Sequence, residues 1–342
     1  MPDPRFFENQ GPVSLGDLAA VCGAGLADPA QSGRSIRSVG PLERVGPDDV
    51  AFYADRRYRD DLAATRAGAV FLTAANVEYA PAGCVLLVTP QPYAAYARAA
   101  ALLHPPKRWH ADDPAIHPSA ELEEGVAIGH GVVVGAYAQI GRGTRIGPYA
   151  VIGPGVAIGR DCQIGARAVI GFALIGDRVK ILAGALIGEP GFGVTTVDDT
   201  TLDVPQLGRV ILQDNVGVGA GTCIDRGAWD DTVVGENTKI DNLVQVAHNV
   251  RLGRNCLLAA QTGISGSVIV GDRVSFGGAS GITDHITIGD GATIAGTAGV
   301  MKSVPPGEMW VGTPARPIRR FMRETAWLAK MARKRVQGPE DE

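Results

Sequence analysis

The sequence predicts a mainly β protein whose centre is a parallel β-helix built from hexapeptide repeats. Three observations lead to this prediction. Aliphatic residues recur every six positions from Ile116 to Ile170, and again from Val234 to Val300, where Phe276 takes one of the positions. Glycine follows eight of the ten aliphatic residues in the first run, and small residues follow most of those in the second. Aromatic residues make up only 6% of the 342 residues, which suits a narrow prism with little room for rings.

A six-residue period matches neither the 3.6-residue period of an α-helix nor the two-residue period of a strand. In a β-helix the branched side chain points into the prism, and the small residue after it lets the chain turn without a clash. The alternative is a β-sandwich of short strands, but its turns would be spaced unevenly, about 8–12 residues apart. About two dozen residues without the period separate Ile187 from Leu212 and predict an excursion from the helix.

Residues 1–110 carry no hexads and predict a small α/β domain. Ser14 is placed to cap a short helix that ends before Gly23. The expected elements are a helix over Leu15–Cys22, strands over Val50–Tyr53, Ala69–Thr73 and Cys84–Thr89, and a helix over Gln91–His104. We expect the β-helix to occupy residues 111–313, followed by a C-terminal helix and tail over residues 314–342.

The C-terminal segment has an apolar helical face and a strong positive charge. The face consists of residues at helical spacing, namely Ile318, Phe321, Thr325, Leu328 and Ala332. Residues 316–335 contain eight basic side chains against one acidic side chain, a net charge of +7. This charge indicates either the solvated side of a packed helix or a docking surface for an acidic partner.

The overall composition excludes several classes of protein. The net charge of −4 argues against a general nucleic-acid binder, which needs a basic domain or stripe. No apolar run approaches the roughly 18 residues of a membrane-spanning helix, and the N-terminus lacks the apolar region of a secretory signal. The five widely spaced cysteines are expected to be reduced thiols in a cytoplasmic protein.

The candidate catalytic residues lie in the second run of hexads. The repeats resemble those of known hexapeptide β-helices, which are left-handed with three hexads per coil, so residues 18 apart should stack at about 4.8 Å. His248 comes two residues after the inward-facing Val246, so we expect it at an outward-facing corner. Gly266 lies one coil further on, with a backbone N–H that no side chain covers. A histidine base beside an open N–H is the minimal geometry for acyl transfer, although a surface histidine without a role is the plain alternative.

The other histidine of this run argues against a metal site. His285 follows His248 by two coils and one residue, which places the two on one face about 10 Å apart. That separation suits the two ends of a substrate. A catalytic zinc site needs about three protein ligands, so a carbonic anhydrase of the hexapeptide type is not expected. No serine or cysteine stands at a matching position, which favours direct transfer over an acyl-enzyme.

Several segments outside and inside the hexads match one known family, namely Ala51–Tyr58, Pro92–Arg98, Ile187–Gly193, Ile224–Ala228, Asp241–Asn242 and Val246–Asn249. Through these segments the chain resembles, over nearly its full length, the UDP-3-O-(3-hydroxyacyl)glucosamine N-acyltransferases of lipid A biosynthesis in Gram-negative bacteria. The resemblance implies a homotrimer with active sites between neighbouring β-helices. It also implies transfer of a 3-hydroxyacyl chain from acyl carrier protein to the 2-amine of the glucosamine.

The resemblance assigns roles to individual residues. His248 matches the general base, Gly266 the oxyanion amide and His285 a contact to the nucleotide sugar. Asn242 and Gln245 belong to the polar substrate-binding cluster around His248. In the N-terminal domain, Phe52 and Tyr58 match the aromatic residues that hold uracil, although core rings of a small domain are the alternative. Asp55 departs from the usual asparagine, so a donor to the uracil edge is lost.

Two further sets of residues concern the acyl chain and its carrier. Thr297 and Gly299 are small where some relatives have methionine, which predicts a longer or differently routed acyl chain. Lys302 and the C-terminal helix match the elements that meet acyl carrier protein. The helix contributes the basic residues Arg316, Arg319, Arg320 and Arg323. No cofactor is expected, because the 4′-phosphopantetheine thioester arrives on the carrier; a weak peripheral contact with a membrane surface stays open.

Three alternatives remain at this point. The related O-acyltransferase that acts on UDP-N-acetylglucosamine shares the β-helix but lacks a 110-residue N-terminal domain. Another hexapeptide transferase would use coenzyme A on a different nucleotide sugar. A structural β-helix without catalysis would leave the polar cluster around His248 unexplained.

Overall fold

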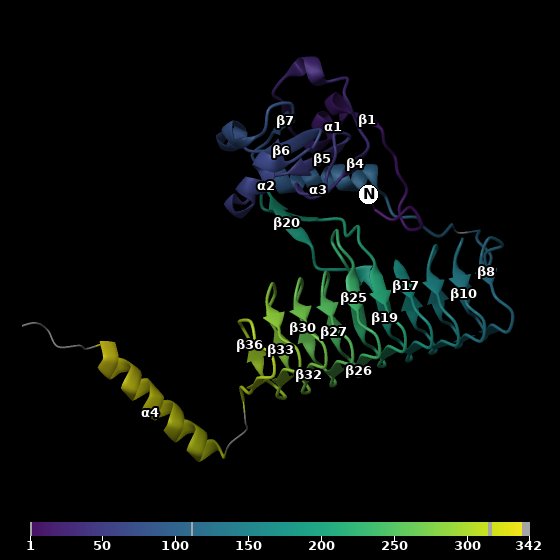
Figure 1. Ribbon diagram of the computed structural model, residues 1–342, viewed down its shortest axis with the longest axis vertical. Helices are drawn as coiled ribbons and strands as arrows, with labels where there is room; N and C mark the ends of the chain where they lie inside the picture. The colour runs from purple at the N-terminus through teal and green to yellow at the C-terminus, as the bar shows by residue number, and fades with distance from the viewer. Residues whose placement is uncertain (1, 111, 314–316, 337–342) are drawn as a thin grey trace, which may run out of the picture.

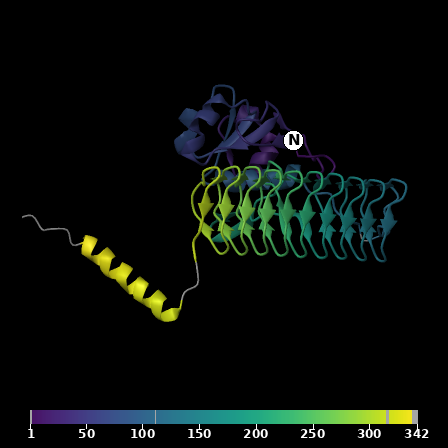
Figure 2. The same ribbon diagram turned by 60° about the horizontal axis from the view of Figure 1, so that its bottom comes forward.

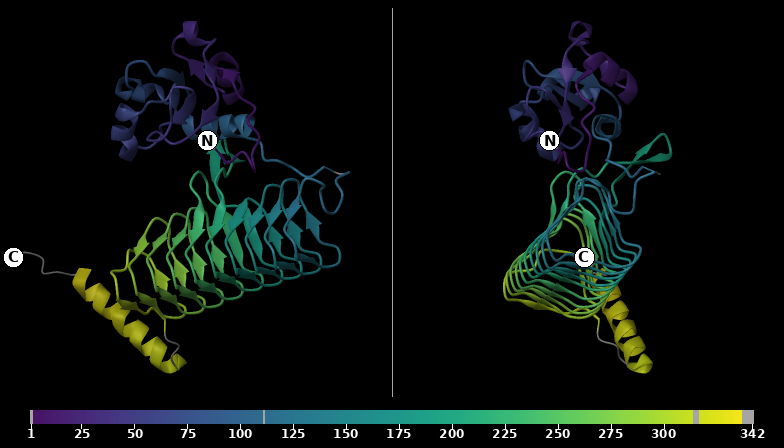
Figure 3. Two further views of the ribbon diagram at one scale, coloured as in Figure 1. Left: turned by 45° about the vertical axis from the view of Figure 1, so that its right-hand side comes forward. Right: turned by 90° about the vertical axis from the view of Figure 1, so that its right-hand side faces the viewer.

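The computed structural model, which describes residues 2–110, 112–313 and 317–336, confirms the left-handed parallel β-helix. In this part of the chain three long parallel sheets form the sides of a triangular prism, which Figure 3 shows end-on. The N-terminal domain lies over the middle of the prism, and the C-terminal helix extends from its last coil (Figure 1).

The strands of each side follow one another along the prism. The first sheet contains β10 (Val133–Val134), β13 (Val151–Ile152), β16 (Val169–Ile170), β19 (Leu186–Pro190), β24 (Cys223–Arg226), β27 (Gln245–Val246), β30 (Gly263–Ile264), β33 (Gly281–Ile282) and β36 (Gly299–Val300). The second contains β8 (Glu121–Leu122), β11 (Gln139–Ile140), β14 (Ala157–Ile158), β17 (Ala173–Ile175), β22 (Val210–Leu212), β25 (Thr232–Val234), β28 (Arg251–Leu252), β31 (Ile269–Val270) and β34 (Thr287–Ile288). The third contains β9 (Ala127–Ile128), β12 (Arg145–Ile146), β15 (Gln163–Ile164), β18 (Lys180–Ile181), β23 (Gly217–Val218), β26 (Lys239–Ile240), β29 (Leu257–Leu258), β32 (Ser275–Phe276), β35 (Thr293–Ile294) and β37 (Met309–Trp310).

The strand register agrees with the predicted 18-residue coil in the second run of hexads. Val246 pairs with Ile264, which in turn pairs with Ile282. The excursion separates the paired residues Ile187 and Ile224 by 37 positions. Stacking therefore continues through the excursion, and residues on both sides of it belong to one sheet.

Two sets of inward-facing residues fill the prism. From Val134 onward the hydrophobic residue of each hexad is buried, as predicted, whereas Ile116 and Leu122 in the first coil are exposed by 42% and 36%. A second buried set, which comes two residues earlier, consists of small or medium side chains that include Val244, Val250, Cys256, Val268 and Ala292. One aromatic ring also enters the prism, because Phe276 is only 3% exposed. The expectation that the prism has little room for rings is therefore too strict at this coil.

The N-terminal domain is a five-stranded sheet with helices, in agreement with the predicted α/β class. In spatial order its strands are β2 (Gly25–Leu26), β7 (Val85–Val88), β6 (Ala69–Leu72), β5 (Asp49–Phe52) and β4 (Ser38–Val39), and the small β1 (Val13–Ser14) pairs with β3 (Ser35–Ile36). Its helices are α1 (Leu15–Cys22), α2 (Arg59–Ala64) and α3 (Pro92–Leu103), with the short 3-10 helices η1 (Pro29–Gln31), η2 (Arg56–Tyr58) and η3 (Ala74–Tyr79). Ser14 caps α1 by accepting from the Asp17 N–H, as predicted.

Two elements leave the body of the prism. The excursion forms a hairpin of β20 (Val194–Val197) and β21 (Thr200–Asp203), and β20 contacts α3 of the N-terminal domain (Figure 1). The helix α4 (Ile318–Val336) extends away from the last coil (Figure 2). Among the described helices, none combines the length and apolar character required to cross a membrane.

Candidate active site

The corner after β27 holds His248 in one tautomer. Asn249 has the left-handed backbone conformation, with φ 61°. Its Oδ1 atom accepts a hydrogen bond from the Ala228 N–H at 2.9 Å and lies 3.0 Å from Nδ1 of His248. Its Nδ2 donates to the Asp230 carbonyl at 3.2 Å, which fixes the orientation of the amide. Because Oδ1 only accepts, Nδ1 of His248 must carry the proton. The lone pair of the neutral imidazole then lies on Nε2, the atom that a general base requires.

Gly266 lies against the imidazole ring on the next coil. A Cβ atom at this position would lie 2.7 Å from Nε2 and 2.6 Å from Cε1 of His248, so only glycine leaves room there. In the described part of the chain, the Gly266 N–H has no hydrogen-bond acceptor. The 18-residue spacing thus brings the two residues together as expected, while their chemical roles remain predictions.

The start of the excursion packs on the other side of His248. A Cβ atom at Gly191 would lie 2.5 Å from the His248 Cβ, so the excursion backbone runs directly beside the histidine. Arg226 holds both ends of the excursion, donating to the Gly188 carbonyl at 2.8 Å and to the Gln206 carbonyl at 2.9 Å. Its guanidinium lies over the Phe172 ring, and burial lowers its pKa to about 10.

Arg226 is a structural residue that the sequence analysis did not assign. The sequence signal for it is an arginine between Ile224 and Val234, where the aliphatic residues depart from the six-residue spacing, and its burial is seen only in the structure. Its two carbonyl contacts keep the excursion, and with it Gly191, in place beside His248.

A carboxylate lies next to this corner. Asp225, on β24, accepts a hydrogen bond from Gln245 Nε2 at 2.9 Å. Burial raises the pKa of the Asp225 carboxyl, and the neighbouring Glu189 raises it further, while the Gln245 hydrogen bond and His248 act in the opposite direction. Asp225 therefore adds an acidic group to the site, and the only sequence signal for it is its place in the segment Ile224–Ala228 that carries the family resemblance.

An open groove runs from this corner along the outer face of the first sheet. It has a volume of about 500 Å³ and is lined by Gln245, Ala247, Gly263, Ile264, Ser265, Gly281, Ile282, Thr283, Gly299, Val300 and Met301. Cβ atoms at Gly263, Gly281 and Gly299 would meet no atom within 4 Å, so larger side chains there would fill the groove. The groove is mostly apolar and fits a hydrocarbon chain.

Only some of the other site residues predicted in the β-helix line this groove. Gln245 and Gly299 line it, whereas Thr297 lies outside its lining, on the preceding turn with φ 60°, and donates to the Gly296 carbonyl. The Asn242 side chain accepts from the Ala220 N–H at 2.7 Å. His285 is exposed at the same edge of the sheet two coils from His248, and its N–H donates to the Gly266 carbonyl.

The predicted uracil-binding residues lie in the N-terminal domain. Phe52 packs between Tyr93 and Tyr96, with ring centroids at 4.9 and 4.8 Å, so it belongs in part to the domain core. Tyr58 is half exposed. Asp55 caps η2 by accepting from the Arg57 N–H, and it forms an ion pair with the Arg57 side chain at 2.7 Å. Within the described residues, none of the three makes a hydrogen bond or ring contact with the His248 corner.

The predicted carrier-binding residues are exposed at the C-terminal end. The Lys302 ammonium lies 5.6 Å from the centre of the Trp310 ring. Arg319, Arg320 and Arg323 project from α4, and Arg320 pairs with Glu324 at 2.9 Å. Arg316 lies outside the described residues. Across the described ranges, no group of three or more His, Cys, Asp or Glu side chains is placed to hold a metal ion.

Comparison with known proteins identifies one family. The model of the family described as UDP-3-O-(3-hydroxymyristoyl) glucosamine N-acyltransferase, LpxD, matches residues 34–102. Models of bacterial hexapeptide transferases match residues 137–172, 231–266 and 267–300.

Several curated proteins are similar along nearly the whole chain. A UDP-3-O-acylglucosamine N-acyltransferase of Caulobacter sp. (strain K31) is 57% identical, with 99% of this chain and 100% of that protein covered. A protein of the same name from Methylobacterium sp. (strain 4-46) is 47% identical, with 100% and 99% covered. Among solved structures, LpxA from Acinetobacter baumannii is 25% identical with a TM-score of 0.45, over 63% of this chain and 78% of that one.

Proposed function

Since the chain belongs to the UDP-3-O-acylglucosamine N-acyltransferase family, we propose that it acylates the 2-amine of UDP-3-O-(3-hydroxyacyl)glucosamine with a 3-hydroxyacyl chain from acyl carrier protein. The observation that carries this proposal is the Gly266 backbone stacked on the His248 imidazole at the start of an open, mostly apolar groove. This arrangement supports the proposal, because an imidazole, a backbone N–H without an acceptor and an apolar groove lie close together.

In the proposed reaction, the free amine attacks the thioester carbonyl while Nε2 of His248 accepts its proton. The Gly266 N–H donates a hydrogen bond to the oxyanion of the tetrahedral intermediate. The C–N bond forms, the C–S bond breaks, and the leaving thiolate takes the proton from the imidazolium. A base of this kind contributes roughly 10²–10⁴-fold to the rate.

The groove accounts for the acyl chain of the donor. We place the chain over Gly263, Gly281 and Gly299, where the absence of side chains leaves the floor open. A longer or differently routed chain is therefore proposed for this protein. Uracil is assigned to Phe52 and Tyr58, with Asp55 as an acceptor only.

The partners follow from the same proposal. The protein acts as a homotrimer whose active sites lie between neighbouring β-helices, and acyl carrier protein docks on Lys302 and α4. The reaction takes place in the cytoplasm of a Gram-negative bacterium, where acylated carrier protein is available. The carrier's phosphopantetheine is the only prosthetic group involved.

The proposal is tested by an acyl-transfer assay with UDP-3-O-acylglucosamine and 3-hydroxyacyl carrier protein. The parent should form an amide that survives mild base, and His248→Ala should keep the fold and lose about 10²–10⁴-fold in turnover. His130→Ala, a histidine elsewhere on the β-helix, is the matched control and should keep full activity. A base-labile product, a preference for coenzyme A thioesters, or full activity of His248→Ala would each refute the proposal.

A further inference from the structure

The loop between β24 and β25 connects the candidate base to the rest of the molecule. Its backbone holds Asn249 from two sides, because the Ala228 N–H donates to Oδ1 and the Asp230 carbonyl accepts from Nδ2. Asn249 in turn pairs with Nδ1 of His248. A displacement of this loop would therefore change the hydrogen bond that determines the tautomer and ring orientation of His248.

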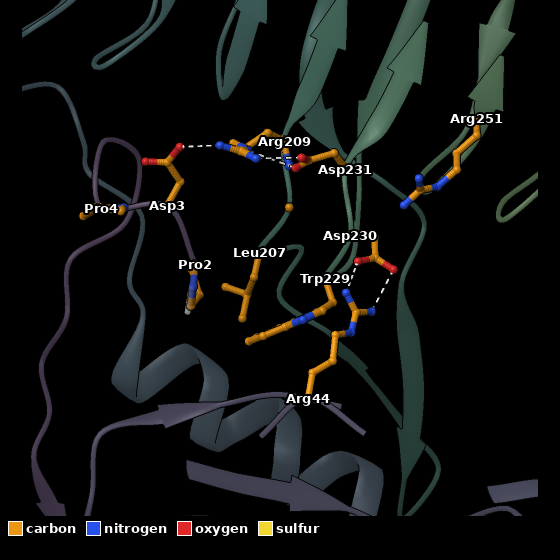
Figure 4. Close-up of a pocket in the computed structure, with 11 residues that line it drawn as sticks. Pro2, Asp3, Pro4, Arg44, Leu207, Arg209, Trp229, Asp230, Asp231 and Arg251 are labelled. Carbon is orange, nitrogen blue, oxygen red and sulfur yellow. Dashed lines mark hydrogen bonds and ion pairs between the residues drawn. The ribbon is translucent and has the colours of Figure 1, made fainter. Parts of the chain in front are cut away.

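The same loop is held by the N-terminal domain on its other side (Figure 4). Arg44 forms two hydrogen bonds with the Asp230 carboxylate, of which the Nη2–Oδ2 bond measures 2.9 Å. The indole of Trp229 packs so closely on Gly40 that a Cβ atom there would lie 3.1 Å from the ring. Arg44 and Asp230 are 186 positions apart in the sequence, and their contact joins the N-terminal domain to the β-helix.

We propose that the Arg44–Asp230 pair is a positioning contact, which holds the loop of residues 227–231 so that Asn249 keeps His248 in the productive orientation. This inference rests on the proposed function, because it assigns Arg44 to the acyl-transfer reaction without contact to the reacting atoms. It connects the domain to which we assign the nucleotide with the base of the reaction.

Because the Arg44–Asp230 pair is exposed, we expect it to orient the loop of residues 227–231 and to add little to the stability of the fold. The Arg44 and Asp230 side chains are 49% and 36% exposed, and ion pairs of this kind contribute little to the free energy of unfolding. A second contact anchors the neighbouring residue, since Arg209 pairs with both Asp231 and Asp3 at 2.7 Å. Loss of Arg44 should therefore leave the domains folded while the Asp230 end of the loop gains freedom.

The first experiment measures kcat and the KM for the nucleotide sugar in Arg44→Gln and in Arg44→Gln/Arg251→Gln. The second variant is needed because Arg251, which lines the same pocket between the N-terminal domain and the β-helix as Arg44 and Asp230, also stabilises the Asp230 charge (Figure 4). We expect kcat to fall about 2- to 30-fold, the range for changes along coupled networks, with an unchanged KM and melting temperature. Arg254→Gln removes a similar exposed arginine from its pair with Asp272 and serves as the matched control.

The charge-swapped variant Arg44→Asp/Asp230→Arg/Arg251→Gln tests the pair itself, without the Arg251 charge that would repel an arginine at position 230, and should recover most of the lost kcat. An unchanged kcat in Arg44→Gln/Arg251→Gln, or a fall in kcat that the swap does not recover, would overturn the inference.

A second measurement does not depend on activity. In protein with ¹⁵N-labelled histidine, the His248 signals should report the Nδ1-protonated tautomer in the parent and a mixture of tautomers in Arg44→Gln/Arg251→Gln. If the parent transfers no acyl chain, the proposed function fails, yet these signals still decide whether the contact orients the ring. Identical signals in the parent and the variant would refute the inference.

Discussion

At the scale of single residues, the contact between Gly266 and His248 leaves no room for any residue other than glycine at position 266. Gly266→Ala keeps the N–H donor but places a Cβ atom 2.7 Å from Nε2 of the imidazole. The ring must move, and misplacement of a catalytic group by about 1 Å costs on the order of 10²-fold. We therefore expect turnover to fall by about that factor in the acyl-transfer assay, with little change in melting temperature.

The control for this substitution is Gly33→Ala. A Cβ atom at Gly33 would meet nothing within 4 Å, so this variant should retain the parent's turnover. Equal turnover in Gly266→Ala and the parent would show that the imidazole does not act from the position seen here.

The residues of this corner also show how far sequence reasoning reaches. A strict 18-residue repeat makes His248 and Gly266 neighbours whatever their chemistry, so their contact was predictable. The roles of Asn249 and Arg44 were not predictable, because Asn249 contacts the irregular loop of residues 227–231 and Arg44 contacts that loop from another domain. The hexapeptide repeat determines which residues stack within the β-helix, but it does not determine which loops or domains pack against the β-helix.

At the scale of elements, the end of α3 contains a buried histidine that makes stability depend on pH. His104 is only 2% exposed, and its Nε2 lies 2.9 Å from the Ser38 hydroxyl. Burial lowers its pKa below the usual 6.5, which a hydrogen bond with the Glu8 backbone only partly offsets. His104 therefore binds a proton less readily in the folded protein than in the unfolded chain. The contribution of His104 to stability is complete above about pH 6.5 and is lost as the pH falls through the lower, folded-state pKa.

Urea unfolding of the parent and of His104→Gln at pH 8 and pH 5.5 measures this effect. The parent should lose more free energy of unfolding than the variant between the two pH values, because other titrating groups act equally on both. Parallel losses would show that His104 is protonated as readily in the folded state as in the unfolded chain.

Prediction of elements succeeded where the pattern was local. The helix Leu15–Cys22 agrees with its prediction to the residue, because Ser14 and Gly23 mark its ends, and the three predicted strands of the N-terminal sheet lie within one residue of their observed bounds. The hairpin of β20 and β21 was expected only as an excursion, since nothing in its own sequence specifies contact with α3. The second buried set in the prism was also missed, although its small side chains recur with the same period of six.

At the scale of the whole molecule, charge is distributed unevenly between the C-terminal segment and the rest of the chain. The chain carries a net charge of −4, while residues 316–335 alone carry +7. The described part of this segment is α4, which follows the last strand of the prism, β37. The apolar groove ends in the same part of the prism, at Val300 and Met301. If the carrier docks on α4, as proposed, its acyl chain would enter the groove from the Met301 end.

That arrangement predicts a salt-dependent affinity for the acyl carrier protein, which is strongly acidic. Arg319→Glu/Arg323→Glu should raise the KM for the carrier thioester about tenfold at low ionic strength, because electrostatic steering is lost. Added salt should raise the KM of the parent towards that of the variant, since exposed charges are screened beyond about 10 Å at 0.1 M. The KM for the nucleotide sugar should stay the same. A small pantetheine thioester, which lacks the acidic protein, is the control donor and should be used equally well by both proteins; an equal loss with this donor would place the effect in the active site and contradict a docking role for α4.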